Sequence, residues 1–162
     1  DDLQLSQSLV QKLRDRGLDA RPKTLAEVAP SQPASDPLPV CGMVLIVDSP
    51  GDQDRATLNG FRYLKEVGKA LQADRQPPAL VALVQRCDGQ FGLSGTESMD
   101  PDLSGAALSG LAKCAAREWP EMFVRSIDLS PEFDDVESAA GELVDELLAG
   151  IEQVHRAVRS VE

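Results

Sequence analysis

The chain has one tyrosine and one histidine, and we first ask whether the tyrosine has the neighbours that proton transfer needs. Reductases that donate a proton from a phenol pair the tyrosine with a lysine four residues on, whose charge lowers the pKa of the phenol. Four residues after Tyr63 stands Val67, while Lys65 and Lys69 lie at the wrong spacing. We therefore interpret Tyr63 as a partly buried helix residue with an exposed hydroxyl.

A nucleophile activated by histidine is the second chemistry to consider. His155 is the only histidine, so it cannot build a multi-histidine metal site, and as a base it needs a nucleophile such as Cys87 or Ser94 beside it. The three cysteines stand at wide spacing, which predicts neither a disulfide framework nor a metal site. We expect a surface histidine, a reducing compartment, and buried small hydrophobes at Cys41 and Cys114. A Cys/His enzyme stays an alternative.

A glycine-rich turn that binds phosphate is the third possibility. Dinucleotide sites need such a turn between a first strand and a helix, so that backbone N–H groups approach the pyrophosphate. Gly89, Gly92 and Gly95 lie in a long loop without the G-x-G-x-x-G pattern. A ligand loop at Asp88, Gly89, Phe91 and Gly92 is possible, because it follows the carboxyl end of a strand. The alternative that we favour is that Phe91 anchors this loop onto the core. We therefore predict no catalytic, cofactor-binding or metal-binding residue.

Size and charge exclude several classes of protein. A chain of 162 residues with 42% hydrophobic and 27% charged residues is typical of one globular domain. The formal net charge of -11 argues against a nucleic-acid partner, since phosphate binding needs clustered Lys and Arg. No window approaches the ~20 apolar residues of a membrane span. The sequence predicts a cytoplasmic protein without nucleic-acid or membrane partners.

Apolar periodicity alternates between helix and strand along the chain. We predict helices and strands in the following order: helix 3–16 ended by Gly17, strand 18–21, a proline-rich loop 22–39, strand 40–47, helix 53–73, strand 79–84, a glycine-rich loop 88–103, helix 104–118, strand 123–129 and helix 136–148 ended by Gly150. This alternation predicts an α/β fold, a parallel sheet with helices on both faces. Because a helix preceded only by Asp1 and Asp2 comes first, we expect a truncated Rossmann-like sheet that lacks its first strand.

Small residues dominate the predicted helix 104–118 and allow it to pack closely on a sheet or a neighbouring subdomain. We expect the packing or interface positions to include Ala107 and Gly110, with Trp119 and Pro120 fixing the exit of the helix.

Four segments resemble a known family. They read DGQFG at 88–92, GAALSGLAK at 105–113, AAREWP at 115–120 and IDL at 127–129. Together they resemble the N-terminal half of ketoreductase domains in type I polyketide synthases, most closely those of polyunsaturated-fatty-acid synthases. In that family a truncated structural subdomain precedes a catalytic subdomain, which binds NADPH and carries the Ser, Tyr and Lys of short-chain reductases.

The resemblance implies a non-catalytic role for this chain. Residues 1–150 would be the structural subdomain, and residues 151–162 a tail or a strand leading toward the catalytic subdomain. The implied partners are that catalytic subdomain, which would hold the NADPH, and the acyl carrier protein of the same synthase. The alternative is a free-standing flavodoxin-like ligand-binding or regulatory module, with its ligand at the strand ends near Asp48 or Asp88.

Overall fold

The computed structural model describes residues 2–23, 41–47, 53–71, 79–91, 93, 104–130, 133 and 135–159. They belong to two compact units. One spans residues 24–131 and contains the sheet, and the other joins residues 1–23 to residues 132–162. The elements in chain order are α1 (Asp2–Asp15), β1 (Gly42–Ile46), α2 (Gln53–Leu71), β2 (Leu80–Arg86), α3 (Ser104–Glu118), β3 (Phe123–Leu129) and α4 (Val136–Arg159). None of these helices, over its described residues, is long and apolar enough to span a bilayer.

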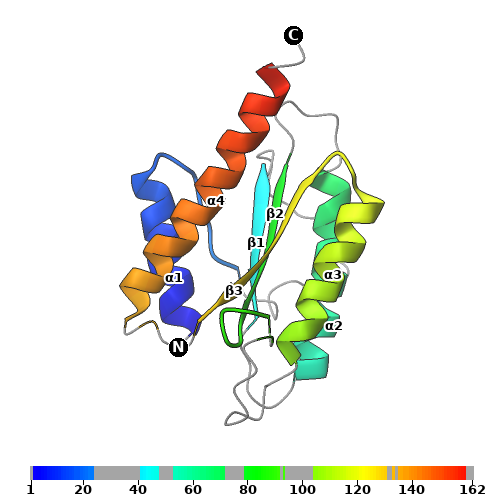
Figure 1. The fold of residues 1–162 in the computed structure, drawn as a ribbon, viewed down its shortest axis with the longest axis horizontal. Coiled ribbons are helices and arrows are strands. Elements are labelled where there is room, and N and C mark those ends of the chain that lie inside the picture. Colours follow the sequence, from blue (N-terminus) through cyan, green and yellow to red (C-terminus); the bar gives the residue numbers. More distant parts are fainter. Residues whose placement is uncertain are drawn as a thin grey trace. The chain divides into compact units, whose positions relative to one another are not determined.

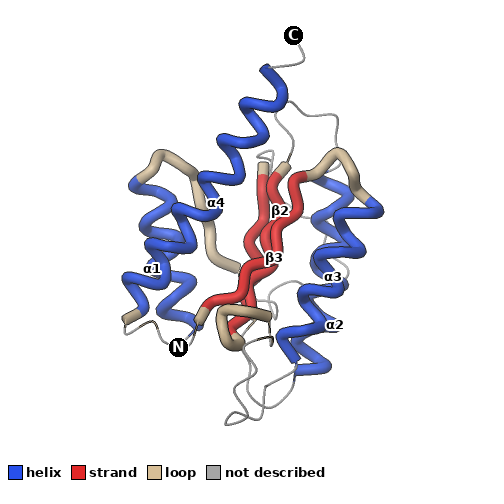
Figure 2. The backbone as a smooth tube through the Cα atoms, in the orientation of Figure 1, coloured by secondary structure: helices blue, strands red, loops and turns tan. Residues whose placement is uncertain are grey.

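The sheet has three parallel strands in the order β1-β2-β3, which lie side by side in Figure 2. Leu80 at the start of β2 is the register partner of Gly42 on one side and of Phe123 on the other. Every residue of β2 except Arg86 is buried. Strands of parallel sheets are apolar runs because both of their faces are covered, so the apolar sequence of β2 reflects its central place. The predicted α/β class with a parallel sheet is confirmed.

One face of this sheet packs against α2 and α3, which run beside each other in Figure 1. Alternate strand residues share a face, so Met43 and Leu45 of β1 point the same way, as do Val81 and Leu83 of β2. The helices complete this core with buried residues at helical spacing: Leu64, Leu71, Leu108, Ala112 and Ala115. The parallel strands need crossover connections, and α2 and α3 lie within those connections.

A glycine allows α2 to approach the end of α3. A Cβ atom at Gly68 would lie 2.5 and 2.7 Å from two ring atoms of Trp119, which is half-buried against the core. The N–H of Trp119 donates to the carbonyl oxygen of Ala115 at 2.9 Å, so Trp119 continues the last turn of α3. Pro120 follows, and its ring cannot continue a helix. The indole thus occupies the space that a side chain at Gly68 would take.

The second unit is a pair of helices, α1 and α4, that contact each other. Leu5 and Leu9 lie one turn apart on α1 and are buried, as are Ala140, Leu143 and Leu147 on α4. Both sets follow the period of an α-helix with one apolar stripe.

Polar contacts at the surface of this pair hold the start of α4. The N–H of Ser138 donates to the Asp135 carboxylate at 2.6 Å, which makes Asp135 the N-cap of the helix. This bond lowers the pKa of Asp135. Glu137 accepts a hydrogen bond from the Ser8 hydroxyl at 2.6 Å and lies 3.1 Å from Lys12, and these contacts, the Ser8 bond first, lower the pKa of Glu137.

Two predicted boundaries are wrong. Residues 18–21 form no strand, because they fold back onto the end of α1: the N–H of Leu18 donates to Leu13, and the carbonyl of Ala20 accepts from Arg14. The last helix does not end at Gly150 but continues to Arg159, so residues 151–159 are helical rather than a strand. The apolar spacing continues past Gly150, and a single glycine costs a helix only about 1 kcal/mol relative to alanine.

The small residues of α3 do not all serve packing. Ala112 and Ala115 are buried, but Ala107 and Gly110 are exposed, so the prediction that these two positions pack the core is wrong. Pro120, which was predicted to fix the exit of the helix, is exposed as well. Only one face of the helix packs against the sheet, and the size of a residue does not determine on which face of the helix it lies. A role for the exposed positions in an interface stays a prediction.

The helices α2 and α3 cover one face of the sheet. The helices α1 and α4 belong to the other compact unit, so a helical layer on the second face stays a prediction. Within the described residues β1 and β3 each pair only with β2, so each has one side without a strand partner there. The expectation that the sheet lacks a first strand stays a prediction.

The two helix glycines provide a matched stability test. Gly68→Ala should destabilise the protein by about 1 to 3 kcal/mol, because the new methyl group overlaps the Trp119 ring. Gly110→Ala should stabilise it by about 0.5 to 1 kcal/mol, since nothing lies within 4 Å of the added Cβ and alanine favours helix. Urea unfolding of both variants measures this. Equal effects of the two substitutions would contradict the contact.

The lowered pKa values of Asp135 and Glu137 predict a pH dependence. A carboxyl group whose pKa is lower in the folded chain stabilises the fold above its unfolded pKa, and this stabilisation is lost as the pH falls through the folded value. The melting temperature should therefore fall as the pH drops below the ordinary values of 4.5 for Glu and 3.8 for Asp.

Asp135→Asn isolates the contribution of the cap. Asparagine keeps the acceptor for the Ser138 N–H but has no titrating group, so stability at neutral pH should hold. The loss of melting temperature between neutral pH and about pH 3 should then be smaller than in the original protein. An identical pH profile would show that the cap does not titrate.

Candidate functional site

Polar side chains meet where the carboxyl ends of β2 and β3 lie next to each other. Arg86 and Leu129 are register partners at these ends. Cys87 and Asp88 follow β2 directly, while Asp128 is the penultimate residue of β3. Open α/β sheets bind their ligands at the carboxyl edge, so this is the first place to look for a site.

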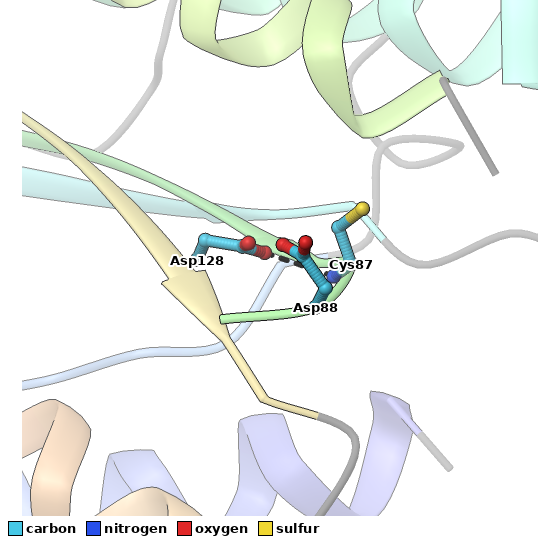
Figure 3. Close-up of side chains that lie close together, drawn as sticks. All are labelled: Cys87, Asp88 and Asp128. Atoms are coloured by element: carbon cyan, nitrogen blue, oxygen red, sulfur yellow. Dashed lines mark hydrogen bonds between the residues drawn. The ribbon is translucent and has the colours of Figure 1, made fainter. Parts of the chain in front are cut away.

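Asp128 holds the loop that follows β2. One oxygen of its carboxylate accepts the N–H of Cys87 at 2.8 Å, and the other accepts the N–H of Phe91 at 2.7 Å. Figure 3 shows the Asp128 side chain reaching from β3 toward the backbone of Cys87. Hydrogen bonds to a charged acceptor contribute more than neutral ones, about 1.5 to 3 kcal/mol each. This carboxylate therefore connects β3 to both ends of the turn 87–91.

The side chain of Asp88 stabilises the same turn through a hydrogen bond within it. Its side chain accepts the N–H of Gln90 at 2.8 Å, an arrangement in which an aspartate imitates a backbone turn. Gly89 has a φ of +74°, and its position faces Ser130, whose Cβ would lie 3.0 Å from a side chain there. Glycine adopts such a φ without steric cost. The loop is therefore a tightly bonded turn.

Phe91 is held in an unusual conformation by this turn. Its φ is +59°, the left-handed region that a bulky residue rarely adopts. Its side chain is 44% exposed, and that of Leu93 is 81% exposed. The prediction that Phe91 anchors the loop onto the core is wrong. The Asp128 carboxylate, through the Phe91 N–H, holds the loop in its place.

Cys87, Asp88 and Asp128 bring three possible metal ligands together. One ligand atom from each, the thiol sulfur and a carboxylate oxygen from each aspartate, lies within 4.8 Å of the other two. Each residue is partly buried, and Figure 3 shows the carboxylates of Asp88 and Asp128 next to each other, with the Cys87 sulfur pointing away from them. The sequence analysis missed this group because its members come from two strands about forty residues apart. The sequence did carry a weak signal, a Cys-Asp pair directly after one apolar strand and an acidic residue near the end of the strand that follows it in the chain.

A buried polar contact ties α3 to the same strands. Gln85 is 1% exposed, and its side-chain oxygen accepts a hydrogen bond from the Ser109 hydroxyl at 3.0 Å. The Ser109 oxygen also lies 3.2 Å from that of Ser126 on β3. A buried amide must be hydrogen-bonded to offset its lost hydration, so this contact fixes α3 over the carboxyl half of the sheet.

Tyr63 lies on α2 and is half-buried against the core. Its pKa is raised by burial. A phenol that donates protons near neutral pH needs the opposite shift. Val67, one turn further along α2, also packs against the core.

The other sequence candidates do not join the cluster in the described residues. Cys41 and Cys114 are exposed, so their predicted burial is wrong. Gly92, Ser94 and Asp48 lie outside the described residues, as does the side chain of His155. The Cys/His alternative therefore stays a prediction.

Neither family models, nor curated proteins, nor solved structures give a match to this chain.

Replacing Asp128 tests its hold on the loop. Asp128→Ala should speed hydrogen exchange at the amides of Cys87 and Phe91 by about 10- to 100-fold, since each loses a bond to a charged acceptor. Asp128→Asn keeps one carbonyl acceptor and should have a smaller effect. The amide of Leu83, inside β2, should exchange as before. Unchanged exchange at Cys87 and Phe91 in the alanine variant would contradict the assignment.

Proposed function

We propose that this chain is a non-catalytic structural subdomain of an NADPH-dependent β-ketoacyl reductase in a polyketide or fatty-acid megasynthase. The proposal rests on the resemblance of residues 88–92, 105–113, 115–120 and 127–129 to such subdomains. The structural observation that supports it is at the carboxyl edge of the sheet, where the Asp128 carboxylate accepts hydrogen bonds from the backbone N–H groups of Cys87 and Phe91.

Nucleotide sites of α/β folds bind phosphate through backbone N–H groups after a strand. In this chain the loop after β2 follows a strand in the same way, and two of its N–H groups already donate to Asp128. A phosphate there would have to displace the carboxylate and would meet its negative charge. This supports a subdomain that leaves cofactor binding to its partner.

The tyrosine supports the same proposal. Tyr63 packs against the core of the sheet unit, and burial raises its pKa. A short-chain reductase needs a phenol of lowered pKa with a lysine one turn away. Under the proposal, the Ser, Tyr and Lys of the reaction belong to the catalytic subdomain, as does the NADPH.

The role of such a subdomain is mechanical. The sheet unit has a central strand that is buried at every residue except Arg86, a bonded polar contact under α3 and a tight fit of Trp119 against Gly68. A rigid body of this kind can hold a catalytic partner in its productive geometry. Displacements of about 1 Å in an active site can cost about 100-fold in rate, so rigidity alone is a useful contribution.

One observation favours the second candidate, a free-standing ligand-binding module. Phe91 keeps a left-handed backbone and an exposed ring at the carboxyl edge, and strained residues cluster at functional sites. A thermal-shift screen separates the two candidates, because a ligand that binds the folded chain raises its melting temperature.

The proposal predicts that the isolated chain binds neither NADPH nor NADH. Titration calorimetry should detect no binding, because the loop amides are already bonded to Asp128. A micromolar dissociation constant for either cofactor would overturn the proposal.

In the complete reductase, a packing variant should act through folding alone. Trp119→Ala removes a half-buried ring, and the loss should lower stability by about 1 to 3 kcal/mol. Activity should fall in step with the folded fraction, and kcat/KM per folded molecule should stay unchanged. Gly110→Ala, which should not lower stability, should leave both the activity and kcat/KM unchanged. Loss of turnover in a variant that melts normally would assign Trp119 a direct part in binding substrate or carrier protein.

A further inference from the structure

The group at the ends of β2 and β3 differs from an ordinary acidic patch because it includes a thiol. Asp88 and Asp128 supply carboxylate oxygens, and Cys87 supplies a sulfur within 4.8 Å of them. Sulfur and oxygen together are ligands for zinc and related ions, while calcium and magnesium prefer oxygen alone. We propose that Cys87, Asp88 and Asp128 bind one divalent cation of the zinc class.

The two amide bonds of Asp128 leave lone pairs on its carboxylate. A carboxylate has about four lone-pair positions. Asp128 uses one on each oxygen for the amides of Cys87 and Phe91, so it can contact a cation while the loop keeps these bonds.

The distances are compatible with a tetrahedral site after a small movement. With metal–sulfur bonds of about 2.3 Å and metal–oxygen bonds of about 2.0 to 2.2 Å, the ligand atoms of a tetrahedral ion lie roughly 3.5 Å apart. The three ligand atoms lie within 4.8 Å of one another, so a pair must close by at most roughly 1.3 Å, which rotation of the Cys87 side chain and small shifts of the carboxylates supply. Water would complete the coordination, since three protein ligands leave one position open.

Binding exchanges the proton of the Cys87 thiol for the metal. The sulfur–hydrogen bond breaks, the proton goes to the buffer, and the sulfur binds the ion, so affinity should rise with pH. The cation also meets favourable charge, because it neutralises two carboxylates in a chain of formal net charge -11. The bound ion would connect β3 to the loop after β2, as Asp128 does through the amides.

Cobalt(II) is the probe for this site, because a thiolate ligand gives it a charge-transfer absorption that carboxylates do not. The reduced chain is titrated with Co²⁺, and zinc is then added in competition. We expect one equivalent of cobalt to produce the thiolate band, zinc to remove it, and excess magnesium or calcium to leave it.

Single substitutions locate the ligands. Cys87→Ser should abolish the thiolate band, and Asp88→Asn should weaken cobalt binding by about 10- to 100-fold while keeping an acceptor for the Gln90 N–H. Cys41→Ser and Cys114→Ser are the matched controls, because both thiols are exposed and stand outside the group. Each variant is first melted without metal to establish that it folds.

The outcomes separate cleanly. A band that depends on Cys87 and survives both control substitutions supports the site, as does a zinc-induced rise in melting temperature that Asp88→Asn reduces. The proposal is overturned if no band forms at millimolar cobalt, if the band follows Cys41 or Cys114, or if Asp88→Asn leaves the affinity unchanged. None of these results depends on ketoreductase activity or on NADPH.

Discussion

The Asp128 carboxylate is the interaction on which the carboxyl edge of the sheet depends. It lies on β3 and accepts two backbone amides from the turn that follows β2, so a single side chain determines where that turn sits. The left-handed Phe91 and the position of Cys87 beside two carboxylates both follow from it. At this edge the acceptor for the two loop amides is therefore a carboxylate of the chain itself.

A steric contact fixes the position of α2 and α3 at the opposite end of these helices. Trp119 follows α3 and lies where a Cβ atom of Gly68 would stand. The layer is thus fixed near the amino ends of the strands by a close contact and over the carboxyl half by the bonded Gln85 and Ser109. The packing of Trp119 against Gly68 and the hydrogen bond between Ser109 and Gln85 together hold α3 in one position on the sheet, although the helix is rich in small residues.

The sequence was sufficient for the elements and insufficient for the site. Apolar runs and helical spacing predicted the three strands and four helices that the described residues form, because buried strands and helices need apolar residues at these periods. Gly150 and residues 18–21 were misread because local breaker and strand signals carry less energy than the surrounding helix and its capping bonds. The bonds from Asp128 to the loop 87–91 were not predicted, because they are tertiary contacts between segments about forty residues apart. The sequence offered only a weak signal for them, an acidic residue near the end of one strand and a Cys-Asp pair after the neighbouring strand.

The two units are nested along the chain, and this arrangement has a consequence for the order of folding. The sheet unit is a continuous segment, residues 24–131, whose strands pair with their nearest neighbours in sequence. The helix pair joins the first residues to the last, so its formation closes a loop of more than one hundred residues. During synthesis the sheet unit can fold as soon as β3 leaves the ribosome, whereas α1 must wait for α4. We therefore expect the packing of α1 on α4 to form after the sheet unit has folded.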